Sequence, residues 1–226
     1  MITNVVLCKK GSMTIPVFHI SKEQAEKNCS VLKSYNKKQL LTFDEFINLK
    51  GVVLTVSGFY ILSAHQPETD GPPSAILLGE ILEDLGLKVY FITDKYAQKL
   101  FVPFVDEEKL IEFPITSDEV ATVFARDLIE TYNPVGIISI ERCGRAQDGK
   151  YYNMKGQDIT AYNAAVDALF FNHHHTISIG DGGNEIGMGN LEQFLIQEKI
   201  TLNPCMIKSR HLIISSVSNY GVYGLI

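Results

Sequence analysis

Short runs of consecutive apolar and β-branched residues recur along the chain, and each predicts a buried β-strand. The apolar residues follow one another with little polar alternation, which is typical of parallel strands covered by helices on both faces. The clearest runs span residues 52–56, 87–92, 135–140, 176–179 and 212–217, and residues 110–113 predict a further short strand.

Segments with helical character lie between these runs. Residues 72–85 begin with two prolines, carry apolar residues along one face and are followed by Gly86, so they predict a complete helix. Residues 117–132 and 160–171 each begin with a hydroxyl side chain suited to capping and predict two more helices. Repeated strand–helix units predict an α/β fold: a three-layer, mostly parallel sheet with helices on both faces, open and Rossmann-like.

We expect a single α/β domain over residues 1–226, with a helical preamble at 1–50 and the core at 51–226. The chain stops at residues 221–226, inside the opening turns of a predicted helix just after the last strand. Such an ending would leave that strand partly uncovered. We therefore expect either a truncated form or an edge covered by a partner chain, as in a homo-oligomer.

Composition narrows the class of protein. A hydrophobic content of 46% and a charged content of 20% predict a soluble globular protein. The net charge of −6 and the absence of any basic run disfavour nucleic-acid binding. No apolar run approaches the roughly 20 residues that span a bilayer, so we expect no membrane association. The four cysteines show no CxxC spacing, which predicts reduced thiols in a cytoplasmic protein.

The richest polar motif follows the strand predicted at 176–179. Residues 180–190 hold five glycines in eleven positions, interleaved with acidic and amide side chains. Glycine lets backbone N–H groups approach a ligand closely, so Gly182, Gly183 and Asn184 are predicted to bind substrate. Asp181 and Glu185 would repel a bare phosphate, hence the loop suits a ligand with a positive group, a metal-bridged ligand, or both.

Polar clusters follow every central strand. In an open parallel sheet they all lie at the carboxyl edge, where such folds bind ligands. Together they predict one binding site built from several loops, whereas each cluster alone is equally explained by capping and turn chemistry. The clusters are residues 68–73, 93–94, 141–145, 180–190 and 218–221.

Three of these motifs resemble the D-glutamate cyclase family. The resembling segments are residues 68–73, 141–159 and 180–190, and the resemblance covers roughly residues 51–226. The resemblance is to the C-terminal domain of the mitochondrial enzyme and to stand-alone bacterial relatives. The resemblance implies a small-molecule substrate and a hydro-lyase activity. D-glutamate would be dehydrated to 5-oxo-D-proline by attack of its amine on its own γ-carboxylate.

That reaction requires a base for the substrate amine and an acid for the leaving oxygen. Glu141 is the candidate acid, provided that burial raises its pKa. Asp181 and Glu185 are candidates to hold the substrate ammonium or a divalent ion such as Mn²⁺ or Mg²⁺, one of them acting as the base. No cofactor other than this ion is expected. Arg142 and Arg145 could clamp the substrate carboxylates. The complete set predicted to bind substrate is Glu68, Asp70, Gly71, Arg142, Arg145, Gly182, Gly183, Asn184 and Asn219.

Other interpretations stay open at this stage. Arg142 and Arg145 could form a surface salt-bridge pair, and Asp70 could simply cap the helix that begins at Pro72. The chain could be a non-catalytic amino-acid-binding module or a truncated, inactive form. It could also be a metal-dependent enzyme acting on a phosphate ester, with Asp181 and Glu185 as metal ligands.

Overall fold

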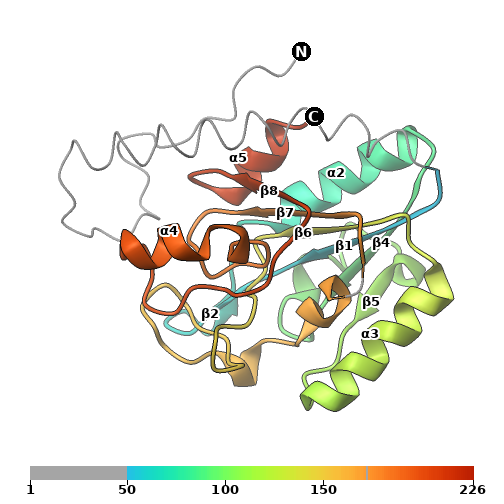
Figure 1. The fold of residues 1–226 in the computed structure, drawn as a ribbon. Helices are drawn as coiled ribbons and strands as arrows, with labels where there is room; N and C mark the ends of the chain where they lie inside the picture. Colours follow the sequence, from blue (N-terminus) through green and yellow to red (C-terminus); the bar gives the residue numbers. More distant parts are fainter. Residues whose placement is uncertain (1–49, 172) are drawn as a thin grey trace.

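The computed structural model describes residues 50–171 and 173–226. A six-stranded sheet runs through its centre, and every neighbouring pair of strands in it is parallel. The spatial order is β5-β4-β1-β6-β7-β8 (Figure 1). The strands are β1 (Val52–Ser57), β4 (Lys88–Thr93), β5 (Leu110–Glu112), β6 (Gly136–Ile140), β7 (Thr176–Gly180) and β8 (His211–Ile214).

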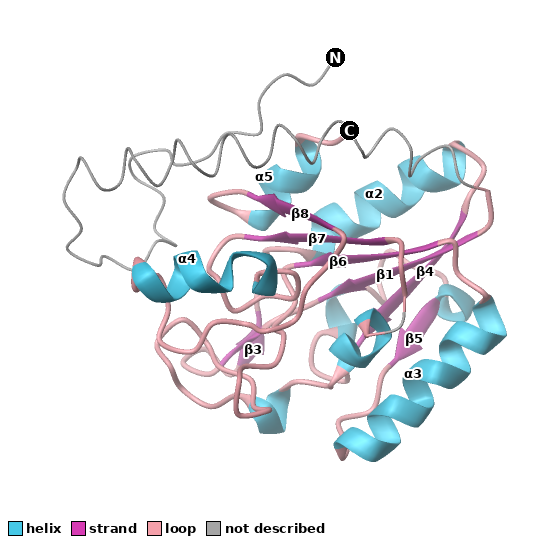
Figure 2. Ribbon diagram, viewed as in Figure 1, coloured by secondary structure: helices cyan, strands magenta, loops and turns pink. Residues whose placement is uncertain are grey.

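Helices cover both faces of this sheet. In Figure 1, α2 (Pro72–Asp84) and α5 (Ser218–Tyr223) lie above it and α3 (Asp118–Tyr132) lies below it. Figure 2 shows that loops make up much of the edge at which the strands end. The remaining elements are the β2–β3 ribbon (Tyr60–Ile61, Gln66–Pro67), α4 (Glu192–Gln197) and the 3₁₀ turns η1 (Gln98–Leu100), η2 (Glu107–Lys109), η3 (Thr160–Tyr162), η4 (Val166–Phe170) and η5 (Gly189–Leu191).

The core consists of two apolar layers, one on each face of the sheet. Successive side chains of a strand point to opposite faces, so Leu54 and Val56 pack in the layer that includes α3. Val53 packs in the other layer, against Leu78 and Leu82 of α2. The near-continuous apolar runs of the sequence thus serve both layers, and the predicted three-layer α/β fold is confirmed.

One predicted helix is wrong. Residues 160–171 form two short 3₁₀ turns, η3 and η4, instead of a single α-helix. The backbone between them has another use, because the Ala164 carbonyl accepts a hydrogen bond from the buried Arg142 side chain. The helical preamble expected at residues 1–50 lies outside the described residues apart from Lys50.

The strand order reverses its direction at β1. From β1 the chain passes to β4 and β5 on one side of the sheet, then returns to β6, β7 and β8 on the other side. Loops that follow β1 and β6 therefore leave the sheet in different directions. In open α/β sheets this is the position at which ligands bind, outside the carboxyl ends of the strands.

Candidate active site

Five carboxylates meet at the carboxyl edge of the sheet. Glu68 and Asp70 follow β1 and the β2–β3 ribbon, Glu141 follows β6, and Asp181 and Glu185 follow β7. One carboxylate oxygen from each of Asp70, Glu141 and Asp181 lies within 4.8 Å of the others. Glu68 and Glu185 are close enough to repel this group electrostatically. Three loops far apart in sequence thus supply one acidic cluster.

Asp70, the cluster residue that precedes α2, is hydrogen-bonded to the N-terminus of α5. The Asp70 carboxylate accepts the backbone N–H of Ser218 at 2.9 Å and that of Asn219 at 2.7 Å, where α5 begins. In return, the Asn219 side-chain oxygen accepts the N–H of Gly71 at 3.0 Å, at the start of α2. Asp70 therefore caps α5 rather than α2, and the two helices lock each other in place.

Glu141 is fixed from both its backbone and its side chain. It is 5% exposed and has a φ of +47°, the left-handed region that a side chain rarely adopts. Its N–H donates to the Ile179 carbonyl at 3.0 Å, and the Ser218 hydroxyl donates to its carboxylate. A strained, buried acid held in this way is a common feature of functional sites.

The glycine loop positions Glu185. Its two carboxylate oxygens accept the N–H groups of Gly182 at 2.9 Å and Gly183 at 2.8 Å. A Cβ added to Gly182 would lie 2.9 Å from one of these oxygens, so a side chain would displace the carboxylate. The loop also pairs with the segment after Glu141, because Ile186 N–H donates to the Arg142 carbonyl at 2.8 Å. The glycines thus bind a carboxylate of the protein itself.

Burial, opposed in part by hydrogen bonds, raises the pKa of all five carboxyl groups. For Glu68, burial and then repulsion from Asp70 and Glu185 raise the pKa to about 8. Burial and then repulsion from Asp181 raise the pKa of Glu141 well above its usual value. Burial and then repulsion from Glu185 raise the pKa of Asp181 well above its usual value. Backbone N–H donors counteract part of the burial effect at Asp70 and Glu185. Burial and mutual repulsion therefore favour the protonated forms of these carboxyl groups.

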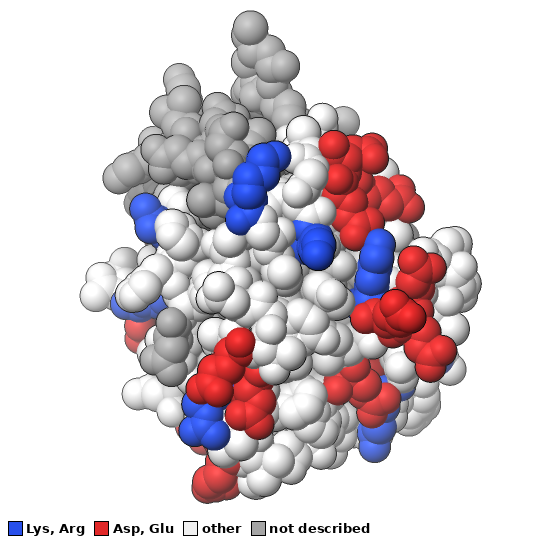
Figure 3. Space-filling view, turned by 90° about the vertical axis from the view of Figure 1, so that its right-hand side faces the viewer, with Lys and Arg blue, Asp and Glu red and all other residues white. Residues whose placement is uncertain are grey.

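No Lys or Arg within residues 50–171 and 173–226 forms a salt bridge with any of the five carboxylates. Charged side chains of both signs are interspersed on the face drawn in Figure 3. Since buried charges are normally paired, the lack of a cation from the described residues makes this partly buried cluster suitable for a positively charged ligand or metal ion.

The clamp expected from Arg142 and Arg145 is corrected by their contacts. Arg142 is 1% exposed, lies 2.6 Å from Asp94 in a buried salt bridge, and donates to the Gly58 carbonyl at 2.8 Å. It connects the ends of β1, β4 and β6. Burial and these partners leave its guanidinium unavailable to a substrate carboxylate.

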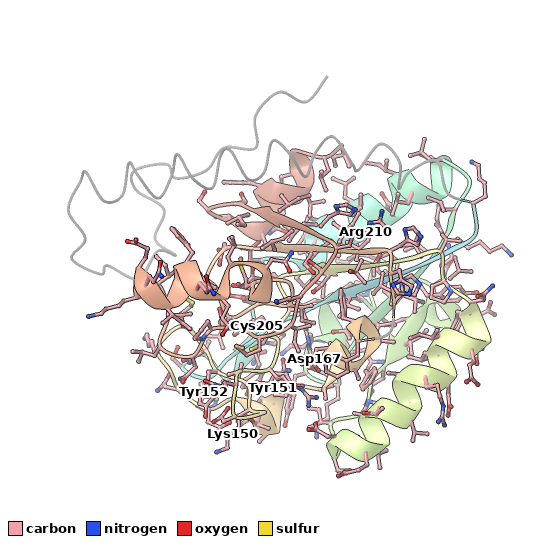
Figure 4. All side chains as sticks on the ribbon, in the orientation of Figure 1. Lys150, Tyr151, Tyr152, Asp167, Cys205 and Arg210 are labelled. Carbon is pink, nitrogen blue, oxygen red and sulfur yellow. The ribbon has the colours of Figure 1, made fainter. Side chains whose placement is uncertain are left out.

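Arg145 is committed to a second network. Its guanidinium contacts Asp118 at 2.8 Å and the buried Asp167 at 3.2 Å. Tyr151 donates to the same Asp167 carboxylate at 2.8 Å, and Figure 4 shows these two labelled side chains near the loop after β6. This network attaches that loop to α3 and η4. The sequence pattern missed Asp167, which lay within the predicted helix at 160–171.

The structure brings the other candidates together. Asn184 is 2% exposed and donates from its side chain to the Tyr152 carbonyl at 2.8 Å, while its side-chain oxygen has no partner. Ser57 was not predicted as a site residue, yet it is fully buried beside the cluster, as is Ser218 of the predicted 218–221 segment. A polar residue at the end of an otherwise apolar run was the signal available for Ser57.

A family model described as D-glutamate cyclase-like, C-terminal, matches residues 18–226. The chain belongs to this family. The match begins before residue 51, so it includes part of the segment expected to precede the family core. Human mitochondrial D-glutamate cyclase is 31% identical over 211 residues, which cover 84% of this chain. They cover 34% of that relative's own length.

Location is a separate question. Among the described residues, no helix is both long and apolar enough to cross a membrane. The human relative is named as mitochondrial, so a cytoplasmic location for this member of the D-glutamate cyclase-like family stays a prediction.

Proposed function

We propose that this protein is a hydro-lyase that dehydrates D-glutamate to 5-oxo-D-proline. Membership of the D-glutamate cyclase-like family supports an enzyme acting on a small molecule. The observation that carries the proposal is the partly buried cluster of five carboxyl groups at the sheet's carboxyl edge, with several raised pKa values. Such groups supply the acid and the base that the reaction needs.

The proton balance of the reaction fits such a cluster. The ammonium group of D-glutamate enters with three protons and the lactam nitrogen keeps one. A C–N bond forms, a C–O bond of the γ-carboxylate breaks, and the departing oxygen leaves as water with the two protons lost by nitrogen. The reaction therefore consumes and releases no net proton. It needs neighbouring groups that accept protons at one atom and deliver them at another, as in general acid–base catalysis.

We assign the delivering role to Glu141. Its burial favours the protonated form, and the Ser218 hydroxyl can keep the second carboxyl oxygen oriented. Asp181, on the neighbouring loop, is the proposed acceptor of the amine protons, since repulsion among close carboxyl groups separates acid from base. Glu185 holds the glycine loop through its two backbone hydrogen bonds and serves as a positioning residue.

A module that only binds an amino acid does not need this arrangement. An ammonium group is held well by one or two ionised carboxylates, whereas protonated carboxyl groups bind it weakly. The strained backbone of Glu141 and the raised pKa values favour proton transfer over simple retention of a ligand.

The test is chiral chromatography of D- and L-glutamate after incubation with the protein, with and without added Mn²⁺ or Mg²⁺. We expect loss of D-glutamate and matching formation of 5-oxo-D-proline, with L-glutamate unchanged. Glu107→Gln, which alters an exposed carboxylate outside the cluster, is the matched control for Glu141→Gln. Absence of turnover of D-glutamate by the folded wild-type protein under every metal condition would reject the proposal.

A further inference from the structure

We propose that Met154 is a substrate-contacting residue that determines specificity. Its thioether forms an apolar roof over the glycine loop (residues 180–190) and packs against the two methylene groups of the substrate. A Cβ added to Gly182 would lie 2.6 Å from the Met154 sulfur and 2.9 Å from a Glu185 carboxylate oxygen. The sulfur therefore lies next to one of the five clustered carboxylates. The inference deepens the proposed function and rests on it for the identity of the substrate.

The long loop that follows β6, on which Figure 4 labels Tyr152, carries Met154 to this position. The Tyr152 carbonyl accepts a hydrogen bond from the Asn184 side chain at 2.8 Å. At the start of the same loop, Gly144 N–H donates to the Asn184 carbonyl at 2.9 Å. Both hydrogen bonds attach the loop to the glycine loop, and they hold Met154 above it.

The surroundings of Met154 are unusual for an apolar side chain. It is half-buried, yet it joins neither apolar layer of the described core. The loop around it is polar: the Asn153 side chain accepts the N–H groups of Lys155 and Gln157, each at 3.0 Å. A methionine between a polar loop and a carboxylate gains little from the core. An apolar group of a ligand would give it a partner.

The Asn184 side chain is a second, independent observation. It is 2% exposed, and its oxygen has no hydrogen-bond partner among the described residues. Since its NH₂ group donates to the Tyr152 carbonyl, its oxygen is turned elsewhere. The Cβ added to Gly182 would lie 3.1 Å from this oxygen, so the oxygen borders the same point as the Met154 sulfur. An unpartnered buried acceptor is unfavourable, and an N–H of the substrate amine would satisfy it.

The chemistry of the substrate explains the use of an apolar roof. D-glutamate carries two methylene groups between its α-carbon and its γ-carboxylate, and both become part of the lactam ring. The carboxyl groups of the cluster interact with polar atoms, so contact with the methylenes must come from an apolar side chain. A roof also excludes water, which strengthens the electrostatic interactions beneath it. Methionine suits this position because its unbranched, flexible side chain can move aside to admit a ligand.

The experiment measures binding of 5-oxo-D-proline by isothermal titration calorimetry, under each metal condition of the activity assay. This product carries both methylene groups but has lost the leaving oxygen, so its binding reports the contact without turnover. We expect Met154→Ala and Met154→Gln to bind it at least about tenfold more weakly than the wild type, as for a lost methylene contact in an apolar pocket. Met154→Leu keeps an apolar side chain of similar volume and should bind like the wild type.

Lys155→Ala is the matched control, because Lys155 is the next residue of the same loop and is exposed. Its affinity should equal that of the wild type. Met154→Gln keeps the length of the side chain, so a loss of affinity in this variant separates the apolar contact from the shape of the loop. Met154 lies outside the core, and circular dichroism establishes that each variant is folded.

Wild-type affinity in Met154→Ala or Met154→Gln, or no binding of 5-oxo-D-proline by the wild type at millimolar concentration, would overturn the inference. The outcome is separable from the proposed function. D-glutamate turnover by protein whose affinity for 5-oxo-D-proline does not depend on Met154 rejects the roof alone. Binding that depends on Met154, without turnover, rejects the function alone.

Discussion

Glu141 and Arg142 are neighbours in sequence, yet they belong to two regions with opposite electrostatics. Arg142 points into a network in which Asp94 neutralises its charge. Glu141 points into a cluster of like charges with no protein cation among the described residues. Proteins normally pair their buried charges, so the paired region is explained by the fold alone. The unpaired region requires a ligand, a proton or a metal ion, and this difference marks it as the site.

The largest effect should come from breaking the paired region. Replacing Arg142 with Met leaves Asp94 buried without its partner, and such a loss typically costs about 3–5 kcal/mol of folding stability. Urea unfolding of the wild type and variant measures this difference. Arg126→Met is the control, because Arg126 is exposed and forms only weak surface ion pairs. An Arg142 variant as stable as the control would show that the buried pair does not hold the loops together.

The unpaired region should respond in the opposite way. Glu141→Gln removes a carboxyl group from a repulsive cluster, so we expect stability to stay equal or to rise. Turnover of D-glutamate should fall by at least about a hundredfold, the low end for a general acid or base. Paired measurements of unfolding and of 5-oxo-D-proline formation check this contrast. A variant that keeps wild-type turnover would remove Glu141 from the proposed mechanism.

Much of this arrangement was predictable from the sequence. Apolar runs predicted the strands, because a strand buried on both faces needs apolar side chains throughout. Strands that end at one sheet edge explain why five polar clusters converge. Asp70, Glu141, Asp181 and Glu185 were all recognised as candidates in this way, and the structure places their carboxylates together.

The errors share one physical origin. Sequence spacing shows that Arg142 and Arg145 lie in a loop beside the site, but it carries no information on which way a side chain turns. The partners of Arg142 come from residues 58, 94 and 164, and Asp167 binds Arg145 from a segment that was predicted to be helical. Such contacts depend on tertiary packing between distant segments, so local patterns could not reveal them.

A smaller effect should follow from crowding the border of the cluster. Gly71 has a φ of +99°, and a Cβ there would lie 2.6 Å from the Ser57 hydroxyl and 2.8 Å from the Glu141 Cβ. We expect Gly71→Ala to cost about 1–3 kcal/mol of stability, through backbone strain and overpacking. Gly149→Ala is the matched control, since Gly149 also has a positive φ but nothing lies within 4 Å of its added Cβ. If both variants lose equal stability, the backbone strain alone explains the effect.

The last effect is gradual and concerns the pH dependence of stability in metal-free protein. Glu68 has a pKa of about 8 in the folded protein, against about 4.5 for an exposed glutamate. Between these values the folded state holds a proton that the unfolded state has released, so stability falls as pH rises from about 4.5 to about 8. One such group contributes at most about 1.4 kcal/mol per pH unit. Glu68→Gln removes the titrating carboxyl group. The stability of this variant should therefore decline less steeply across the same pH window.

Urea unfolding in the presence of a chelator at several pH values measures both slopes, with Glu107→Gln as the control. Equal slopes in the wild type and in Glu68→Gln would mean that Glu68 is ionised in the folded state and that a positive charge, not a proton, balances the cluster.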